Sequence, residues 1–420
     1  MKPVLDVAIV GAGMAGLACA ARLRALGVEH FEVFDQGVAV GASWRRHYDR
    51  LSLNSPFHDL PDDGGIRERW GTFFRRDELL AYLEAYVEHH QLARWLTFGV
   101  RVEDVRRNAR WELRTTKGVH EARYLVMATA INRHPRLPQI PNAEVFGGRS
   151  LHSCEYKNAD PFRHQRVLVI GSGNSAADIA LDLVEGHARS VALWVRGPRH
   201  VISRDDFGRG AARARRMRIA FTTESLVKGH SYTRVHPEWR QRLAEQDSFL
   251  QSYAIDLSDY GIRRPEVGPG TLIHTHSREP WYDSGTAREI RSGRIEVIDG
   301  NVDPIESFTK GGVRSSTGER TFDTVIFGTG FVPNLEAFFG NETDLLAWDD
   351  ARRCRMPSTD GRCRSNAEPS LFFPAFDDTP NGGMSLGLWG FEAADTIGRE
   401  LKEHGIQLNG ISLAMEGGTA

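Results

Sequence analysis

Two stretches of the chain share one pattern, in which a short apolar run rich in β-branched residues is followed directly by a glycine turn and a helix of small residues. The stretches are VLDVAIVGAGMAGLACAARL, residues 4–23, and RVLVIGSGNSAADIALDL, residues 166–183. A further apolar run follows each helix, FEVFD ending at Asp35 and SVALWV ending at Val195. Such runs beside glycine turns predict buried parallel strands joined by helices. The pattern therefore predicts the α/β fold class with two Rossmann-like domains.

The first glycine turn has the spacing of a dinucleotide site. Gly11 would permit the tight turn, Gly13 would let the backbone approach a pyrophosphate, and Gly16 would let the helix pack closely on the strand. Free N–H groups at the helix N-terminus would bind the phosphates, and Asp35 would accept hydrogen bonds from a ribose. The residues expected to contact this nucleotide are Gly11, Ala12, Gly13, Met14, Ala15, Gly16, Asp35 and Gln36.

The second glycine turn differs from the first in two ways. Its third small residue is Ala176, and Arg196 follows its second strand where the first site has an acid. A guanidinium can pair with a 2′-phosphate, so Arg196 predicts NADPH over NADH. Arg199 competes for this role, and a solvated strand end is the structural alternative for Arg196. The expected contacts are Gly171, Ser172, Gly173, Asn174, Ser175, Asp178 and Arg196.

Composition narrows the class of partner. The 420 residues suit two domains, and the formal charge of −2 provides no field that would attract nucleic acid. No apolar run of about 20 residues predicts stable membrane insertion, and Asp6 interrupts the N-terminal run that resembles a signal peptide. The four cysteines form no CxxC pair and no metal-like cluster, so we expect a cytoplasmic protein without a metal site. A small-molecule substrate is the expected partner, and a homodimer is compatible with the sequence.

The segment between the two turns carries a family resemblance. FGGRSLHSCEY, residues 146–156, fits FxGxxxHxxxY, the identifying pattern of the flavin-containing monooxygenases. The chain resembles class B of that family, and in particular the bacterial YUCCA-like flavin monooxygenases, over nearly its whole length. The stretches similar to the YUCCA branch are YKNADPF from Tyr156, SWRRHYDRLSL from Ser43, DYGIRRPEVGP from Asp259, REIRSGRIEVIDG from Arg288 and FDTVIFGTGFVPN from Phe322.

The resemblance implies the cofactors, the domains and the reaction. FAD would bind a discontinuous domain of residues 1–145 and 328–420, and NADPH would bind residues 146–327, inserted in the first domain. NADPH would reduce FAD, and O2 would add to give a C4a-(hydro)peroxyflavin that passes one oxygen atom to a small organic substrate. Oxygenation of nitrogen or sulfur is ranked first. Oxidative decarboxylation of a 2-oxo acid or Baeyer–Villiger oxidation of a ketone is the alternative.

Several residues take roles from the resemblance. Asn54 would lie beside the flavin ring and act as the catalytic residue, because its amide can donate to the peroxide. His152 is expected to set the linker path between domains rather than to transfer a proton. The C-terminal helix is expected to begin near Gly390 and to point at the flavin, and Ala130 replaces a usual glycine. The remaining expected cofactor contacts are Gly41, Ser43, Trp44, Leu51, Asn54, Val102, Ala128, Thr129, Gly328, Thr329 and Gly330.

Three alternative functions stay open. A flavin disulfide reductase would share both nucleotide folds but needs a redox-active cysteine pair, which the sequence lacks. An NADPH oxidase that releases hydrogen peroxide is compatible with every motif. A non-enzymatic FAD-binding scaffold would not need the second site. The basic segment of residues 204–218 is interpreted as a solvated helix face, because the chain around it is not basic.

Overall fold

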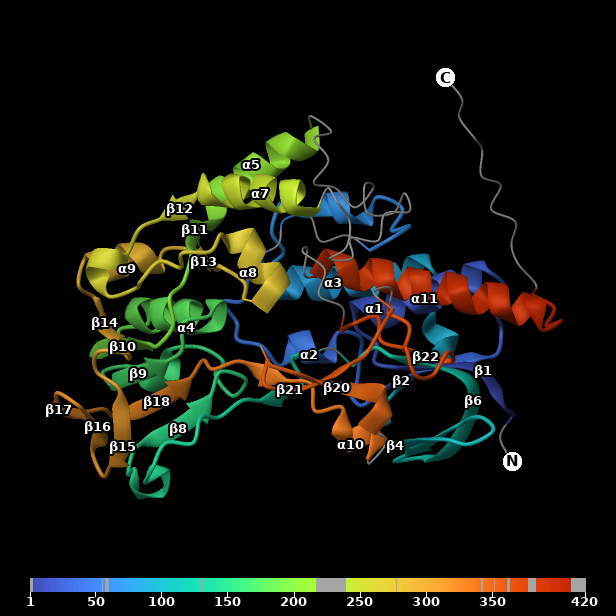
Figure 1. The fold of residues 1–420 in the computed structure, drawn as a ribbon, viewed down its shortest axis with the longest axis horizontal. Helices are drawn as coiled ribbons and strands as arrows, with labels where there is room; N and C mark the ends of the chain where they lie inside the picture. Colours follow the sequence, from blue (N-terminus) through green and yellow to red (C-terminus); the bar gives the residue numbers. More distant parts are fainter. Residues whose placement is uncertain are drawn as a thin grey trace.

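The structure, a computed structural model, describes most of the chain (Figure 1). Ala130 and residues 217–218 of the basic segment lie outside the described residues. The described ranges are 3–54, 56, 60–129, 131–216, 239–276, 278–340, 343–350, 352–360, 363–376 and 383–408.

The first sheet has the order β3-β2-β1-β6-β5-β4, and β22 also pairs with β6. Its strands are β1 (Leu5–Val10), β2 (Phe31–Asp35), β3 (Leu96–Phe98), β4 (Val102–Arg107), β5 (Trp111–Thr115), β6 (Gly118–Met127) and β22 (Leu371–Phe372). β1 runs parallel to β2 and β6, and Val10 lies opposite Phe34 and Met127. The carboxyl ends of these three strands therefore meet at one edge, which is where ligands bind in open α/β sheets.

Helices and short elements surround this sheet. The α-helices are α1 (Met14–Ala25), α2 (Ala42–Arg45), α3 (Arg76–His89), α10 (Glu336–Phe339) and α11 (Gly383–Glu403). A two-stranded sheet of β20 (Leu346–Asp349) and β21 (Cys354–Pro357) belongs to the same part of the chain. The short 3₁₀ helices here are Ile66–Arg69, Ala93–Trp95 and Thr343–Leu345. The expected strands and helix of the first nucleotide unit are thus present.

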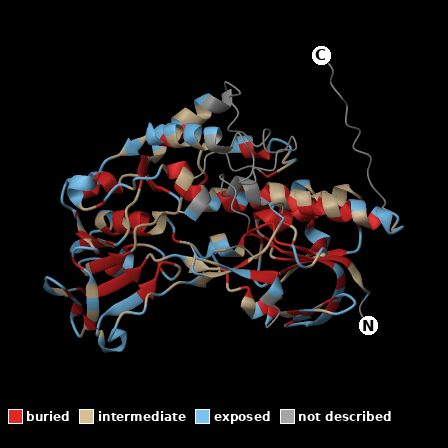
Figure 2. Cartoon of the chain, viewed as in Figure 1, coloured by how far each residue is buried: buried red, intermediate tan, exposed pale blue. Residues whose placement is uncertain are grey.

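The second sheet is entirely parallel, with the order β14-β10-β9-β18-β8. Its strands are β8 (Arg149–His152), β9 (Arg166–Ile170), β10 (Ser190–Val195), β14 (Ile295–Asp299) and β18 (Thr324–Phe327), and its helices are α4 (Asn174–Glu185) and α9 (Thr286–Arg291). Short 3₁₀ helices span Ala143–Val145 and Asp160–Phe162. The two sheets lie side by side, and Figure 2 shows that their strands carry much of the buried core. The chain has the expected α/β fold with two Rossmann-like domains.

Smaller sheets complete the second half. β15 (Ile305–Thr309), β16 (Gly312–Ser315) and β17 (Gly318–Thr321) form an antiparallel sheet. Between β10 and β14 the chain adds β11 (Val201–Ser203), α5 (Arg204–Arg216), α7 (Trp239–Gln251), β12 (Ala254–Ile255), a 3₁₀ helix at Ser258–Tyr260, α8 (Pro269–His276) and β13 (Trp281–Asp283). α5 confirms that the basic segment is helical over its described residues.

A short two-stranded link joins the halves. β7 (His134–Pro135) leaves the first half, and β19 (Phe331–Val332) returns to it and pairs with β7 in antiparallel fashion. The Nε2 atom of His152 lies 3.0 Å from the carbonyl oxygen of Gly330, and its ring contacts Phe331 edge-on. These contacts are consistent with the expectation that His152 sets the path of the linker.

α11 lies across α1 in a close helix contact (Figure 1). The expected start of this helix near Gly390 is wrong, because α11 begins at Gly383. Gly390 lies inside the helix, where an added Cβ would be 2.2 Å from the carbonyl oxygen of Ala15. Its lack of a side chain lets two backbones approach, which is a packing role and not a helix start.

Candidate active site

One cavity of about 430 Å³ lies where the two halves meet. The first half contributes the turn after β1, the ends of β2 and β6, and the segment from Ala42 to Asn54. The second half contributes Asn174 and Ser175 at the start of α4, together with Glu279. The first glycine turn and the start of α4, which directly follows the second glycine turn, therefore line a common space, as hydride transfer between two nucleotides requires.

The first turn fits the pyrophosphate of a dinucleotide. Gly11 has a φ of +112°, and a Cβ added there would lie 2.6 Å from the carbonyl oxygen of Ala128. A Cβ on Gly16 would lie 1.9 Å from the carbonyl oxygen of Gly11, whereas one on Gly13 would meet nothing within 4 Å. Gly11 and Gly16 thus serve the backbone packing. Gly13 leaves open space at the N-terminus of α1, where a phosphate would accept hydrogen bonds from backbone N–H groups.

Asp35 is oriented by backbone amides at the end of β2. Its Oδ2 accepts from the N–H of Ala12 at 2.8 Å, and its Oδ1 accepts from the N–H of Gly37 at 2.7 Å. Each carboxylate oxygen retains a lone pair for a further donor, so the ribose hydroxyls of FAD fit this position. Thr129 adds a hydroxyl oxygen that is buried and has no hydrogen-bond partner among the described residues. Both groups fit a polar ligand in the cavity.

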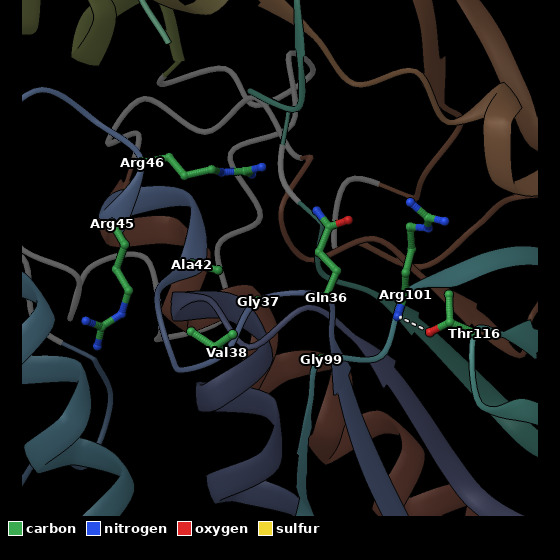
Figure 3. Close-up of a pocket in the computed structure, with 9 residues that line it drawn as sticks. All are labelled: Gln36, Gly37, Val38, Ala42, Arg45, Arg46, Gly99, Arg101 and Thr116. Atoms are coloured by element: carbon green, nitrogen blue, oxygen red, sulfur yellow. Dashed lines mark hydrogen bonds between the residues drawn. The ribbon is translucent and has the colours of Figure 1, made fainter. Parts of the chain in front are cut away.

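A second hollow adjoins this end of the cavity (Figure 3). It shares Gln36, Ala42, Arg46 and Arg101 with the main cavity. Figure 3 shows the side chain of Arg46 extending across the opening, while Arg45 points away from it. Arg45 pairs with Glu84 on α3, which accounts for its direction. The full lining is Gln36, Gly37, Val38, Ala42, Arg45, Arg46, Gly99, Arg101 and Thr116.

The segment expected to lie beside the flavin ring lines the same cavity. Asn54 is partly buried, and its amide has no hydrogen-bond partner within the described part of the chain. The backbone before it is fixed, because the N–H of Leu53 donates to the carbonyl of Phe74 at 2.8 Å. Burial lowers the pKa of His47 to about 4, and the charges of Lys157 and Arg46 act in the same direction. The His47 ring is therefore neutral at physiological pH.

The second glycine turn packs against the return strand. Gly171 has a φ of +144°, and a Cβ there would lie 2.2 Å from the carbonyl oxygen of Gly328. A Cβ on Gly173 would meet nothing within 4 Å, which matches the open side of Gly13 in the first turn. Asn174 holds the turn by accepting from the N–H of Tyr282 at 2.7 Å and donating to the carbonyl of Pro280 at 3.1 Å.

Two arginines stand beside this turn without an acidic partner among the described residues. Arg199 donates to the hydroxyl of Ser172 at 3.1 Å and to the carbonyl of Glu279 at 3.0 Å. Arg278 donates to the carbonyl of Pro198 at 3.1 Å. Burial lowers the pKa of Arg199 to about 10, and the charge of Arg278 adds to the effect. Two nearby cations that are compensated only by neutral groups form a binding position for an anion.

Arg196 differs from Arg199 in its surroundings. It follows β10 directly, as expected, but it is exposed. Its carbonyl oxygen accepts from the side chain of Asn301, and no salt bridge of its guanidinium occurs among the described residues. Its role in binding a 2′-phosphate stays a prediction. Arg199, the competing candidate, is the arginine that contacts the glycine turn.

Polar contacts of Tyr48 and Arg50 join the two halves beside the cavity. The hydroxyl of Tyr48 donates to Asp178 on α4 at 2.9 Å, and the hydroxyl of Tyr156 donates to Asp182 at 2.6 Å. Arg50 forms a salt bridge with Glu185 on the same helix. Asp178 and Glu185 on α4 therefore hold the cavity-lining segment, whereas the contact between Tyr156 and Asp182 lies within the second half. The tyrosine of the FxGxxxHxxxY pattern acts structurally, because it binds this helix.

The structure brings most of the expected site residues together. Those that line the cavity are Gly11, Gly13, Met14, Ala15, Asp35, Gln36, Ser43, Trp44, Leu51, Asn54, Val102, Ala128, Thr129, Asn174 and Ser175. Those that do not line it are Ala12, Gly16, Gly41, Gly171, Ser172, Gly173, Asp178, Arg196, Gly328, Thr329 and Gly330. In the second group, Gly16, Gly171 and Gly328 serve backbone packing, and Asp178 contacts Tyr48.

Sequence reasoning missed several lining residues. His47, Tyr48 and Arg133 line the cavity, as do Phe338 and Ala375 from distant parts of the chain. His47 and Tyr48 lie between the expected contacts Trp44 and Leu51, so their position was a usable signal. Phe338 and Ala375 carry no motif and reach the site only through the tertiary fold.

A cavity lined by one glycine turn and by the first residues of the helix after a second glycine turn is typical of a flavoprotein oxidoreductase that binds two dinucleotides. A family model described as pyridine nucleotide-disulphide oxidoreductase matches residues 8–208. All four cysteines are free, and among the described residues no group of three or more His, Cys, Asp or Glu could hold a metal. No described helix has the length and apolar character to cross a membrane.

The curated relatives specify the family. Indole-3-pyruvate monooxygenase YUCCA1 of Oryza sativa subsp. japonica is 33% identical over 84% of this chain and 82% of its own length. The probable indole-3-pyruvate monooxygenase YUCCA1 of Arabidopsis thaliana is 32% identical over 78% of this chain and 75% of its own length. The chain belongs to the flavin monooxygenase family that includes the YUCCA enzymes. FAD and NADPH, the expected cofactors, are those of this family.

Solved structures agree on the fold. Cyclohexanone monooxygenase bound to ε-caprolactone gives a TM-score of 0.70 at 18% identity, covering 96% of this chain and 88% of that one. The flavin-containing monooxygenase from Stenotrophomonas maltophilia gives 0.66 at 21% identity, covering 95% and 99%. OTEMO in complex with FAD and NADP gives 0.69 at 19% identity, covering 96% and 87%. At these identities the likeness establishes a shared architecture.

Proposed function

We propose that this flavin monooxygenase uses NADPH and O2 to transfer one oxygen atom to a small organic substrate bound in the shared cavity. The observation that carries the proposal is that the first glycine turn and the start of α4, directly after the second glycine turn, line the same cavity. When bound, FAD supplies the redox chemistry with O2. One oxygen atom enters the product, and the other leaves as water with the two electrons from NADPH.

The chain's own residues supply binding and orientation. The N-terminus of α1 and the open side of Gly13 would hold the FAD pyrophosphate, and Asp35 would accept from its ribose. The amide of Asn54, which has no partner among the described residues, would donate to negative charge that develops in the cavity. The apolar side chains of Leu51, Ile131 and Phe338 would limit access of water.

The sheet topology supports the expected domain boundaries, which we retain as part of the proposal. The FAD domain would comprise residues 1–145 and 328–420, and the NADPH domain residues 146–327. The support is that β22 returns to the first sheet beside β6, while β8 to β18 of the second sheet all lie between Arg149 and Phe327.

Arg199 and Arg278 support a preference for NADPH. Both are cations beside the second glycine turn, and neither has an acidic partner among the described residues. The 2′-phosphate of NADPH would compensate the charge of these arginines, and NADH lacks this phosphate. Arg196 stays a second candidate for this contact because of its position after β10.

For the oxygenated atom, we now rank the carbonyl carbon of a 2-oxo acid first. The support is that curated relatives, similar along most of this chain, are named as indole-3-pyruvate monooxygenases. Nitrogen or sulfur oxygenation, ranked first from the sequence, is the second candidate, and Asn54 and Tyr156 at the motif positions favour it. The target atom depends on cavity contacts that sequence patterns describe only partly.

The deciding experiment supplies the FAD-loaded protein with NADPH, labelled O2 and a panel of aromatic 2-oxo acids, thioethers and amines. A decarboxylated acid that carries the label, formed in proportion to NADPH consumed, is the expected result. Labelled sulfoxides or N-oxides with inert 2-oxo acids would reverse the ranking. NADPH consumption that yields only hydrogen peroxide with every substrate would instead identify an NADPH oxidase.

A further inference from the structure

One wall of the cavity carries a cation that the nucleotide turns do not use. The segment after β6 contributes Ile131, Asn132 and Arg133, and Phe338 and Ala375 lie on the same cavity lining. The Arg133 side chain is half-buried. Its Nη1 donates to the carbonyl of Asn334 at 3.1 Å, and its Cζ lies 4.1 Å from the centroid of the Phe338 ring. The ring and the carbonyl hold the guanidinium in place.

The charge of Arg133 has no acidic partner among the described residues. No carboxylate of the described residues lies within 4.0 Å of the Arg133 guanidinium, although Asp35 and Glu279 line the same cavity. Asp35 is held by the amides of Ala12 and Gly37, and Glu279 belongs to the second half. Burial lowers the pKa of Arg133, yet a guanidinium stays charged at neutral pH. A half-buried charge of this kind is stabilised when an anion binds beside it.

The anion has two chemical sources, a carboxylate of the substrate or a phosphate of FAD. The FAD pyrophosphate already has the N-terminus of α1 and the open side of Gly13. Phe338 contacts Arg133 directly, and the cavity lining also includes the apolar side chains of Ile131 and Ala375. A cation beside apolar side chains suits a carboxylic acid with an apolar body better than it suits a pyrophosphate.

We propose that Arg133 is a specificity-determining residue that binds the carboxylate of an apolar organic acid, with Phe338 and Ile131 contacting its body. The inference rests on the proposed function for the identity of the cavity. It adds the residue that distinguishes acids from neutral carbonyl compounds. A planar guanidinium can bind a carboxylate through two parallel hydrogen bonds, which a neutral ketone does not form.

Direct binding tests the proposal without turnover. The FAD-loaded protein is titrated anaerobically with phenylpyruvate and with phenylacetone, a neutral ketone of similar body, and the flavin absorbance is followed. Arg133→Met should weaken phenylpyruvate binding by about 10- to 100-fold, the loss of a charged hydrogen bond, and leave phenylacetone within about twofold. Arg133→Lys should recover part of the loss. Arg110→Met, which removes an exposed arginine paired with Glu121 outside the cavity, should change neither.

The FAD dissociation constant separates the two anion sources. Weakened FAD binding with an unchanged ratio of acid to ketone affinity would assign Arg133 to the cofactor phosphate and overturn the proposal. If Arg133→Met fails to fold, wild-type protein is titrated with phenylacetate and phenylacetamide, and equal affinities would overturn it. If acids bind through Arg133 but no labelled product forms, the inference stands and the proposed function fails.

Discussion

The hydroxyl of Tyr48 donates a 2.9 Å hydrogen bond to the carboxylate of Asp178, and both side chains are buried. Tyr48 belongs to the segment of the first half that lines the cavity, and Asp178 lies in the second turn of α4, the helix that follows the second glycine turn. The contact therefore fixes one half of the chain against the other. Removing this hydrogen bond tests how strongly the two halves are held together.

Tyr48→Phe should lower the free energy of unfolding by about 1–2 kcal/mol, because the buried Asp178 carboxylate loses its shorter hydrogen bond and keeps only the 3.3 Å one from Ser284. Chemical denaturation of the FAD-loaded protein measures this change. Tyr260→Phe is the matched control, since Tyr260 is 41% exposed. Equal stability of the two variants would show that the buried bond makes no net contribution.

The same carboxylate predicts a dependence of stability on pH. Burial raises the pKa of Asp178 to about 6, although the hydrogen bond from Tyr48 and the charge of Arg204 lower it. The folded state then binds a proton more tightly than the unfolded state, whose carboxyl titrates near 3.8. This group therefore favours folding below about pH 4, and its contribution falls as pH rises from 4 to 6, by up to about 1.4 kcal/mol per unit. Asp178→Asn should remove that slope in denaturation curves measured across this range, whereas an identical slope would exclude Asp178 as its source.

Coenzyme preference should depend on the arginines of the second half. Arg199→Ala should raise the KM for NADPH and leave the KM for NADH nearly unchanged, with a loss of about 1.5–3 kcal/mol for a charged hydrogen bond. Arg196→Ala tests the candidate that the sequence suggested first. Steady-state kinetics with both coenzymes measure the two variants in parallel. Parallel increases in KM for NADPH and NADH would remove the affected arginine from 2′-phosphate recognition.

Asn54→Ala should separate NADPH consumption from product formation. The amide lines the cavity without a partner among the described residues, so its loss should leave reduction by NADPH intact. Stabilisation of negative charge during oxygen transfer should weaken, and more hydrogen peroxide should be released per NADPH. A peroxide assay beside product quantification measures this ratio. An unchanged ratio would take Asn54 out of the reaction.

Gly13 and Gly16 of the first turn should respond differently to one added methyl group. Gly16→Ala should destabilise the protein by about 1–3 kcal/mol, because its Cβ would overlap the carbonyl oxygen of Gly11. Gly13→Ala should change stability without cofactor by less than about 0.5 kcal/mol but weaken FAD binding, because its Cβ would enter open space beside the phosphate position. Unfolding of the FAD-free protein and FAD titration separate the effects. Full FAD affinity in Gly13→Ala would place the phosphate elsewhere.

The sequence predicted the nucleotide units because their signals are local. The spacing of Gly11, Gly13 and Gly16 is required by contacts within a few residues, and the turn has the form expected. Tyr48 and Asp178 are 130 residues apart, and no local pattern predicts that pair. Arg133 was not predicted because its ring partner Phe338 meets it only in the folded chain.

The C-terminal helix shows how a local signal can mislead. Its glycines resemble a loop or a helix start when only neighbouring residues are considered. A glycine is instead required at position 390 because a Cβ there would lie 2.2 Å from the carbonyl oxygen of Ala15, a residue 375 positions earlier in the chain. A glycine that serves a contact between distant helices has the same sequence signature as a glycine that ends one.

The contact between α1 and α11 also has a consequence for biosynthesis. The helix that would receive the FAD pyrophosphate is synthesised before the second sheet, and its packing partner α11, the last described helix, is synthesised after it. β22, which completes the pairing of β6, is likewise synthesised after every strand of the second sheet. The nascent chain can therefore complete the NADPH-binding sheet while the FAD-binding half still lacks its final strand and helix. Stable loading of FAD then requires that α11 has been synthesised, and ribosome-bound chains ending before α11 would be colourless.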